Sequence, residues 1–409
     1  MSRALSSVLV AFALVVVGPA PVGGTVTPGP GDFDPRFSGN GLVLLPTGHD
    51  LRVAALGGGS LVSVAPYGGW SVTKLTARGA PDPAFAGDGT ALFDLPFLLG
   101  PEIAVTHGGG VIGAGIHYNR DVPRSFIRIV RISAVGRRLL SFGRQGVVRL
   151  DPFPHFSEMV TGVVVQPSGR IVVAGYFQDG PHLRGTSPFL LGITPSGELD
   201  PAFGDGGLVV PTFARHSQVV GLGMTTTGRL VGVGVAYPGP VTVVARWRVN
   251  GSIDRSFGDR GIAQFPDDYW AYALAMAPGD ETLVAVYRPT FGEEGIFRLT
   301  DDGIVDPSFG DGGVAMLPGR EARGLAVQAD GSTLAATSSD ESDEDVLITR
   351  IDADGLVDPS FGLDGTTRIV RDGDDAPYAA ALDRAGRLLV AGYTDGPSDR
   401  MAFVARILT

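Results

Sequence analysis

A short phrase that ends in Phe recurs seven times along this chain, and no other sequence feature constrains the fold as strongly. In most copies the phrase reads Asp-Pro-X-Phe, and a Gly follows every Phe after four residues. The repeated residues are Phe37, Phe85, Phe142, Phe203, Phe257, Phe309 and Phe361. A period of about fifty residues is the signature of an array built from one supersecondary unit. The repeat therefore predicts one array for the 409 residues, although length alone would suggest two or three domains.

The unit at 314–365 shows what each repeat contributes. It contains four short apolar or alternating stretches, separated by turn residues such as Asp330-Gly331. The stretches lie at 314–318, 322–329, 332–337 and 346–351. Stretches of this length with period two, bounded by Gly and Asp, are typical of antiparallel strands joined by hairpins. The sequence therefore predicts an all-β fold, a single seven-bladed β-propeller of four-stranded antiparallel blades.

The two ends of the chain complement each other. The first copy of the phrase has no unit before it, and the last unit has no outer strand after 402–408. Joining 406–409 to 31–34 recreates the text of 350–358 almost without a gap. We therefore expect 34–46 to supply the outer strand of the last blade, so that the propeller comprises 34–409. Such closure removes exposed strand edges.

The phrase and one hairpin resemble a known family. Residues 305–310 (Val-Asp-Pro-Ser-Phe-Gly) and 165–169 (Val-Gln-Pro-Ser-Gly) are similar to the core and hairpin of the delta-60 repeat family of bacterial extracellular proteins. The resemblance covers about 34–409, and the second unit departs from it with Leu139-Leu140 in place of Asp-Pro. It implies an exported seven-bladed propeller and transfers no catalytic residues.

The residue types of the phrase suit a structural role. Asp can accept hydrogen bonds from nearby N–H groups, Phe can fill the gap between blades, and the following Gly is expected to adopt a positive φ. A basic residue precedes the Phe by eleven positions in most copies, and Gly192 is the exception. We expect ion pairs such as Arg298 with Asp306 and Arg350 with Asp358. A working catalytic or metal site would not be copied around the whole ring.

The start of the chain predicts export. Residues 1–24 combine Arg3, an apolar stretch at 5–17 and small residues, which is the pattern of a secretory signal. The apolar stretch is short for a membrane span, and an uncleaved anchor is the alternative. We expect 25–33 to form a flexible leader. The mature protein is then secreted or extracytoplasmic, without membrane insertion.

The composition argues against disulfide bonds and against nucleic acid as a partner. The chain contains no Cys, so no disulfide framework is available. The net charge of −11 and the lack of a basic cluster argue against nucleic acid as a partner. We expect a monomer.

Aromatic residues gather at one end of the predicted strands. Strand direction places the links between blades and the loops between second and third strands on the same face, where the nine tyrosines and five of the six His lie. Variable loops on a rigid scaffold commonly carry function, and aromatic residues are favoured in recognition surfaces. The alternative is that the tyrosines cap strand ends. The candidate ligand-binding residues are Tyr67, Trp70, Tyr118, His155, Tyr176, Tyr237, Tyr269, Trp270, Tyr287 and Tyr393.

Two acidic loops, 338–345 and 372–375, suggest a cation. Carboxylate and carbonyl oxygens suit Ca²⁺, which makes Asp340, Asp343 and Asp345 candidate ligands. Neither loop has the spacing of a known calcium loop, and a solvated charged loop is the alternative. No other cofactor is predicted.

The sequence favours an exported propeller that binds a cell-surface glycan or an extracellular protein through its Tyr/His-rich face. The first alternative is a secreted lyase or hydrolase with its site in the central funnel, although no Ser-His-Asp order, zinc-binding pair or phosphate loop occurs. The second alternative is a structural surface or matrix component. Convergent His and carboxylates with perturbed pKa values would favour the enzyme, whereas an aromatic groove would favour binding.

Overall fold

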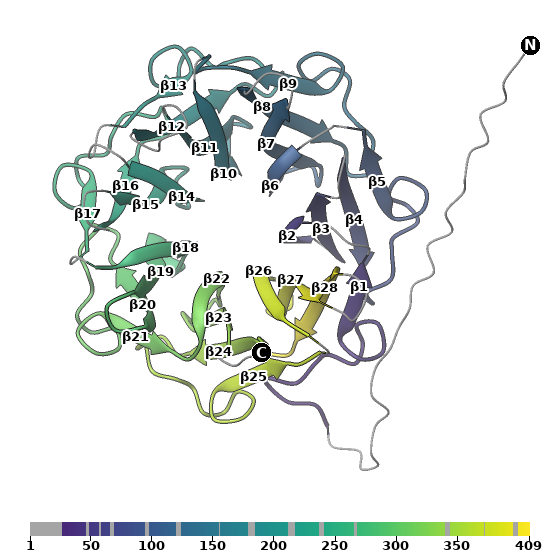
Figure 1. Ribbon diagram of the computed structural model, residues 1–409, viewed down its shortest axis with the longest axis vertical. Coiled ribbons are helices and arrows are strands. Elements are labelled where there is room, and N and C mark those ends of the chain that lie inside the picture. Colours follow the sequence, from purple (N-terminus) through teal and green to yellow (C-terminus); the bar gives the residue numbers. More distant parts are fainter. Residues whose placement is uncertain are drawn as a thin grey trace, which may run out of the picture.

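The computed structural model arranges seven four-stranded antiparallel sheets in a ring around a central axis (Figure 1). It describes residues 27–45, 49–56, 59–65, 69–94, 98–119, 124–154, 156–178, 185–211, 217–236, 241–265, 268–339, 344–371, 373–395 and 400–409. Within these ranges the only helical segment is the short 3₁₀ turn Pro278–Asp280. The fold class predicted from the repeat is confirmed. The predicted signal at 1–24 lies outside the described residues.

Blades 1 to 6 each consist of four strands that are consecutive in sequence. The first strand lies nearest the axis and the fourth lies at the outside of the ring (Figure 1). Blade 1 contains β2 (His49–Leu56), β3 (Gly59–Ala65), β4 (Trp70–Thr76) and β5 (Thr90–Phe93). Blade 2 contains β6 (Leu98–Val105), β7 (Val111–Asn119), β8 (Arg124–Ile132) and β9 (Val147–Leu150). Blade 3 contains β10 (Ser157–Val165), β11 (Ile171–Gln178), β12 (Thr186–Ile193) and β13 (Leu208–Val209).

The remaining blades follow the same order. Blade 4 contains β14 (Ser217–Met224), β15 (Leu230–Ala236), β16 (Val241–Trp247) and β17 (Ile262–Gln264). Blade 5 contains β18 (Trp270–Met276), β19 (Thr282–Arg288), β20 (Glu293–Leu299) and β21 (Val314–Leu317). Blade 6 contains β22 (Arg320–Val327), β23 (Thr333–Ser338), β24 (Val346–Ile351) and β25 (Thr366–Ile369).

Blade 7 is assembled from both ends of the chain. Its inner strands are β26 (Asp375–Leu382), β27 (Leu388–Asp395) and β28 (Arg400–Ile407), and its outer strand is β1 (Leu42–Leu45). β1 pairs antiparallel with β28, with Leu42 opposite Ala405 and Leu45 opposite Ala402. Figure 1 shows β1 beside β28, next to blade 1.

The predicted leader at 25–33 is shorter in the structure, because residues 30–32 are bonded into the ring. The Gly31 N–H donates to the Leu408 carbonyl at 2.8 Å, and the Leu408 N–H donates to the Asp32 carbonyl at 2.9 Å. The Thr367 hydroxyl donates to the Gly31 carbonyl at 2.7 Å. In blade 6 the corresponding turn, between the third strand and the Asp of the phrase, is one continuous segment. In blade 7 the turn is divided between the two chain ends, so 30–32 must supply half of it.

The Phe of every phrase lies between neighbouring blades. All seven Phe side chains are at most 1% exposed. Phe85, for example, packs in one cluster with Val111 and Ile132 of blade 2. The Gly four residues after each Phe has a φ between 81° and 106°, as predicted for this tight turn. These glycines are Gly41, Gly89, Gly146, Gly207, Gly261, Gly313 and Gly365.

One backbone hydrogen bond is repeated at every blade interface. The N–H of the residue after the Phe donates to a carbonyl in a turn of the next blade, over 2.7–3.0 Å. The pairs are Ser38–Arg78, Ala86–Val135, Gly143–Ser196, Gly204–Asn250, Gly258–Asp302, Gly310–Asp354 and Gly362–Pro30. The carbonyl of the seventh pair belongs to Pro30, near the start of the chain. This segment therefore completes an interface that, in the other blades, is formed by a turn within the blade.

The predicted ion pairs inside the blades are confirmed. Arg298 Nε donates to Asp306 Oδ2 at 3.0 Å, and Arg350 Nε donates to Asp358 Oδ2 at 2.9 Å. Where Gly192 replaces the basic residue, Arg170, which lies directly before strand β11, donates through Nε to Asp200 Oδ2 at 2.6 Å instead. The Asp carboxylate is therefore balanced by a guanidinium even in the exceptional blade.

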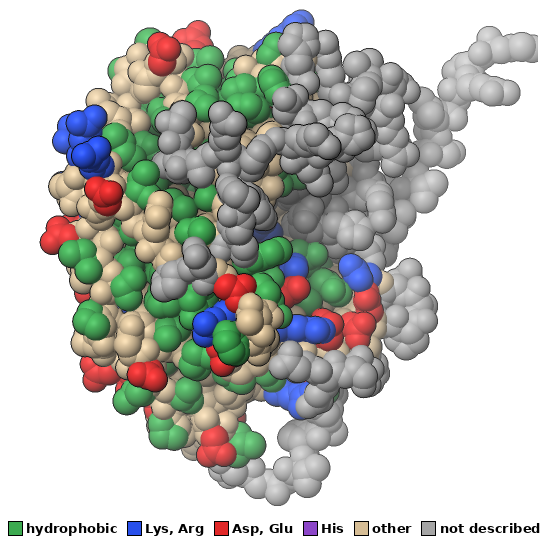
Figure 2. Space-filling view, turned by 60° about the vertical axis from the view of Figure 1, so that its left-hand side comes forward, with side chains coloured by type: hydrophobic (Ala, Val, Ile, Leu, Met, Phe, Trp, Pro, Cys, Tyr) green, Lys and Arg blue, Asp and Glu red, His purple; other side chains and the backbone are tan. Residues whose placement is uncertain are grey.

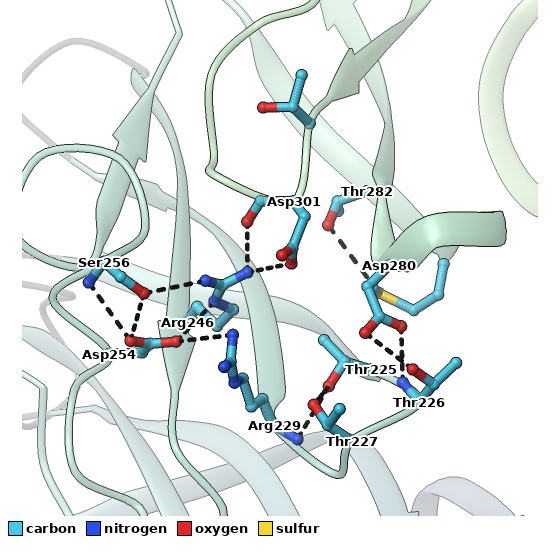
Figure 3. Close-up of polar contacts among 12 residues, drawn as sticks. Thr225, Thr226, Thr227, Arg229, Arg246, Asp254, Ser256, Asp280, Thr282 and Asp301 are labelled. Atoms are coloured by element: carbon cyan, nitrogen blue, oxygen red, sulfur yellow. Dashed lines mark hydrogen bonds and ion pairs between the residues drawn. The ribbon is translucent and has the colours of Figure 1, made fainter.

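Some of these arginines also cross to the next blade. Arg246 Nε donates to Asp254 Oδ2 at 2.9 Å, and its Nη1 reaches the backbone and side chain of Asp301 in blade 5 (Figure 3). The guanidinium lies 4.8 Å from the centre of the Phe257 ring. On the same interface Asp280 accepts from the N–H and hydroxyl of Thr226, at 2.7 and 2.9 Å (Figure 3).

Truncation tests the role of the chain start. A variant that begins at Phe33 loses the hydrogen bonds made by Pro30, Gly31 and Asp32, each worth roughly 0.5–1.5 kcal/mol. We expect a loss of roughly 2–5 kcal/mol in the free energy of unfolding, measured by urea denaturation. A matched variant that begins at Gly29 keeps these bonds and should unfold like the longer chain. Equal stability of the two variants would contradict the assignment.

Acid unfolding tests the ion pairs. In six phrases, hydrogen bonds and guanidinium or ammonium partners lower the pKa of the Asp below its ordinary 3.8. A carboxyl with a lowered native pKa stabilises the folded state above its unfolded pKa, and this contribution is lost as pH falls through the native pKa. We expect the melting temperature to drop below about pH 4. In Asp306→Asn the drop should be smaller, and an unchanged pH profile would contradict this role.

Candidate ligand-binding channel

Every innermost strand contains one interruption in its pairing with the second strand. The interruptions lie between His49 and Arg52, Leu99 and Glu102, Val160 and Gly162, Val219 and Gly221, Ala271 and Ala273, Arg320 and Gly324, and Pro377 and Ala379. An irregularity of this kind bends a strand and turns a side chain out of the regular alternation. The ring therefore presents an irregular segment from each blade near the axis.

Residues at these interruptions line a cavity of about 540 Å³ on the axis. Every blade contributes one of them: Arg52, Glu102, Thr161, Val220, Tyr272, Arg323 and Tyr378. The backbone irregularity is repeated, but the side chains differ in charge and size from blade to blade. A concave cavity with a few converging polar groups is the usual form of a small-molecule site. We call this cavity the axial channel.

The axial channel has a polar side and an apolar side. Blades 6, 7, 1 and 2 are consecutive in the ring and contribute Arg323, Tyr378, Arg52 and Glu102 (Figure 1). Blades 3 and 4 contribute mainly apolar side chains, and blade 5 adds Tyr272 and Leu274. The apolar lining residues of these three blades are Met159, Val160, Val163, Val220, Leu222, Ala273 and Leu274, and Ile103 of blade 2 adds one more. A ligand that fills the channel therefore meets charged groups on one side and hydrocarbon on the other.

Arg52 and Glu102 form an ion pair across blades 1 and 2. Arg52 Nε donates to both carboxylate oxygens of Glu102 at 3.0 Å, and its Nη2 donates to Oε1 of the same carboxylate. Arg52 Nη1 also donates to the Leu51 carbonyl at 2.8 Å. The two side chains are 27% and 14% exposed, so the pair is largely shielded from water. The carboxylate of Glu102 is thus fixed by the guanidinium.

Arg323 lies between the tyrosines of blades 5 and 7. Its Nη2 donates to Glu321 Oε2 at 2.6 Å, and its guanidinium lies 5.7 Å from the centre of the Tyr378 ring. Tyr378 in turn lies 5.6 Å from Tyr393, ring centre to ring centre. In Figure 2, Lys or Arg and Asp or Glu side chains lie next to one another in the middle of the view.

Tyr272 keeps its proton over the physiological range. Burial raises the pKa of its hydroxyl above the ordinary 10.0, and the negative charges of Glu321 and Glu294 raise it further. The ring lies 6.4 Å from that of Tyr287 on the adjacent strand. A neutral phenol can both donate and accept a hydrogen bond, so Tyr272 offers either function to a ligand.

The structure places Trp70 in the core instead of on a binding surface. Its side chain is completely buried, and its Nε1 donates to the Ser63 hydroxyl at 2.8 Å. Its ring stacks on Phe93 at 5.1 Å and lies over Gly113 of the next blade. Trp70 is the first residue of strand β4, and its ring packs between blades 1 and 2. It cannot contact a surface ligand, and this candidate is corrected.

Several other predicted residues do lie at the expected end of the strands. Pairing places Tyr176 opposite Met159, Tyr287 opposite Trp270, and Tyr393 opposite Ala376. All three tyrosines lie within their strands near the end, not in the loops. We call this side of the ring the link face, because the inner strand of each blade begins there and its second strand ends there.

Blade 5 carries an aromatic group on the link face. The Arg288 guanidinium lies 4.0 Å from the centre of the Phe291 ring and 5.4 Å from that of Tyr269. Tyr269 also packs edge-on against Phe297, and Trp270 is 39% exposed. Tyr67, His155 and Tyr237 lie outside the described residues, as does the side chain of Tyr118, whose backbone belongs to β7.

The main lining residues Arg52, Glu102, Tyr272, Arg323 and Tyr378 were absent from the candidates drawn from the sequence. The sequence does carry a signal for part of this set. A small residue follows the channel residue directly in five blades: Thr161-Gly162, Val220-Gly221, Tyr272-Ala273, Arg323-Gly324 and Tyr378-Ala379. These small residues are visible as the start of the innermost runs, and the residue before each one points to the axis.

The acidic loops give no group of three or more His, Cys, Asp or Glu suited to a metal among the described residues. Asp340 and Asp343 lie outside the described part of the chain. Asp345 is 5% exposed, and Arg368 Nε donates to its Oδ2 at 2.5 Å. An arginine therefore already balances the charge of this candidate ligand.

Two buried carboxyls lie where blades meet on the link face. Glu158 is 2% exposed, and its Oε2 accepts from the Ser125 hydroxyl of blade 2. Burial raises the pKa of Glu158 to about 7, and the Asp151 charge adds to this. Asp375 is completely buried, and burial followed by the Asp345 charge raises its pKa to about 6.

Because the pKa of Glu158 is raised, we expect the free energy of unfolding to depend on pH. A raised native pKa stabilises the folded state fully below the ordinary 4.5, and this contribution is lost as pH rises through about 7. We expect the free energy of unfolding to fall by up to roughly 3 kcal/mol over this window. Glu158→Gln should flatten the slope, whereas Glu198→Gln serves as an exposed control. An equal slope in all three proteins would refute the burial argument.

A family model described as "Domain of unknown function (DUF5122) beta-propeller" matches residues 166–203 and 328–361. Each segment runs from the inner hairpin of a blade to the Phe of its phrase, in blades 3 and 6. The match supports a propeller family and covers a minor part of the chain. A comparison with curated proteins finds no match.

A comparison with solved structures finds several proteins of low sequence identity. A puromycin hydrolase is 14% identical, with a TM-score of 0.52 over 84% of this chain and 50% of that chain. A Trypanosoma rangeli sialidase is 8% identical, with a TM-score of 0.50 over 90% and 59% of the two chains. A protein of unknown function from Dyadobacter fermentans DSM 18053 is 12% identical, with a TM-score of 0.47 over 75% and 94%. At these identities the likeness to the hydrolase and the sialidase shows the general fold alone.

Proposed function

We infer that this protein is an exported ligand-binding propeller of the delta-60 repeat type, and that it holds a glycan in the axial channel. The observation that carries this proposal is the set of seven interruptions, whose side chains differ around a shared cavity of about 540 Å³. A purely structural ring would need no such difference. The volume suits one or a few sugar units, whereas a protein partner would need a broad surface.

The chemistry of the lining suits a sugar. The hydroxyls of Tyr272 and Tyr378 have no hydrogen-bond partner among the described residues and can donate to or accept from sugar hydroxyls. The rings of the two tyrosines and the apolar side of the channel can cover the C–H faces of a sugar ring. A polar edge combined with an apolar face is what distinguishes sugars from most small polar metabolites.

Binding is favoured over catalysis because the carboxylate in the described lining of the channel is already paired with an arginine. Among the described lining residues Glu102 is the only Asp or Glu, and Arg52 donates to both of its oxygens. Glycoside hydrolysis ordinarily requires two carboxyls on opposite sides of the bond to be broken. The second carboxyl has no counterpart in the described lining of the axial channel.

A glycan-binding screen with matched variants tests the proposal. We expect Tyr272→Ala and Tyr378→Ala each to weaken binding of the selected oligosaccharide about 10-fold or more, because each removes a hydrogen bond and stacking area. Trp270→Ala, on the same face and outside the channel lining, should bind like the unaltered protein. Calorimetry gives the affinities, and thermal melting verifies folding.

The reverse outcome would move the site. If Trp270→Ala abolished binding and both channel variants kept it, the ligand would lie on the rim of the link face instead of in the axial channel. Absence of binding to every glycan in the screen would overturn the proposed function.

A further inference from the structure

We propose that the glycan held in the axial channel is acidic, and that Arg323 binds its carboxylate. This inference rests on the proposed function and specifies the class of ligand. It starts from the hydrogen bonds of Arg323. Glu321 is the one hydrogen-bond partner that Arg323 has in the described part of the chain, and it engages only Nη2. Nη2 carries two N–H groups and Glu321 accepts from one of them, so one complete edge of the guanidinium, formed by Nη2 together with Nε or with Nη1, is left for a ligand.

Arg323 differs in this respect from the other channel arginine. The guanidinium of Arg52 is occupied by Glu102 and by the Leu51 carbonyl. Arg323 is about one third exposed, with its side chain at 36%. A guanidinium presents its donors as a planar fork that matches the two oxygens of a carboxylate. Among the described lining residues, Arg323 is thus the cation that keeps a free guanidinium edge of suitable geometry for a carboxylate.

The backbone that carries Arg323 is held in place from the neighbouring blade. Glu294 of blade 5 is 1% exposed and accepts from the N–H groups of Glu321 and Ala322, at 3.1 and 2.8 Å. Glu321 adopts a φ of 55°, a conformation that these bonds stabilise. The Tyr378 ring supports the guanidinium from blade 7. The arginine is therefore oriented before a ligand arrives, which reduces the entropy lost on binding.

The opposite side of the channel fixes the rest of the ligand. Met159, Val220 and Leu222 offer hydrocarbon to a ring face while the acidic group points toward blade 6. Because the protein carries a net charge of −11, its overall field repels anions. Selection of an acidic ligand then depends on Arg323 locally. A uronic acid unit, with a carboxylate on a sugar ring, has the required combination.

Paired oligosaccharides test this inference. The probes are uronic-acid oligosaccharides and the same compounds after reduction of the carboxyl group to a primary alcohol. We expect at least one acidic probe to bind the unaltered protein about 10-fold or more tightly than its reduced form. Arg323→Gln should bind both forms with equal, weak affinity, and Arg323→Lys should keep part of the preference because it keeps the charge.

Arg320→Gln is the matched control. Arg320 lies on the same strand, is 43% exposed, pairs with Glu344 and does not line the channel. It should keep the preference for the acidic form. Equal binding of acidic and reduced probes by the unaltered protein, or binding of neutral glycans alone, would overturn the acidic class while leaving glycan binding intact. Failure of Tyr272→Ala and Tyr378→Ala to weaken any binding would instead refute the channel as the site.

Discussion

The structure depends on one interface repeated seven times. At each position a completely buried Phe fills the gap between blades, and the N–H that follows it donates to a turn of the next blade. A buried Phe contributes roughly 2–3 kcal/mol through burial, and the backbone bond satisfies the N–H of the residue that follows the Phe. Without disulfides, these contacts and the short sheets hold the ring together. The arginine that covers several of the Phe rings adds an ion pair at the same place.

A rigid outer interface leaves the inner strands free to vary. Because the phrase fixes where each blade lies, every innermost strand brings the residue at its interruption to the axial channel. Some of the side chains at that point also link blades, as in the ion pair of Arg52 with Glu102 and the hydrogen bond from the Thr161 hydroxyl to the Val219 carbonyl. The seven positions carry Arg, Glu, Thr, Val or Tyr on the same backbone irregularity. A repeated outer interface combined with different inner side chains explains how a repeated sequence can build an asymmetric channel.

The repeat predicted the blades well because its signals are local. The phrase around Phe361 contains its own turn, and the pairing of Arg350 with Asp358 follows from a fixed offset within one unit. The role of Pro30 was missed because the bonds it makes join opposite ends of the chain. Trp70 was misplaced because a loop residue and the first residue of a strand look alike in sequence.

Arg323 was missed for a different reason: convergence on the axis is a property of the closed ring, not of any one repeat. The central claim is that the ligand occupies the axial channel, and amide hydrogen exchange with and without a bound oligosaccharide tests it most directly. We predict that saturating ligand slows exchange in β18, β22 and β26 around Tyr272, Arg323 and Tyr378, and leaves the outer strands unchanged. Protection confined to the outer strands or to the loops around Trp270, with no change in these inner strands, would contradict it.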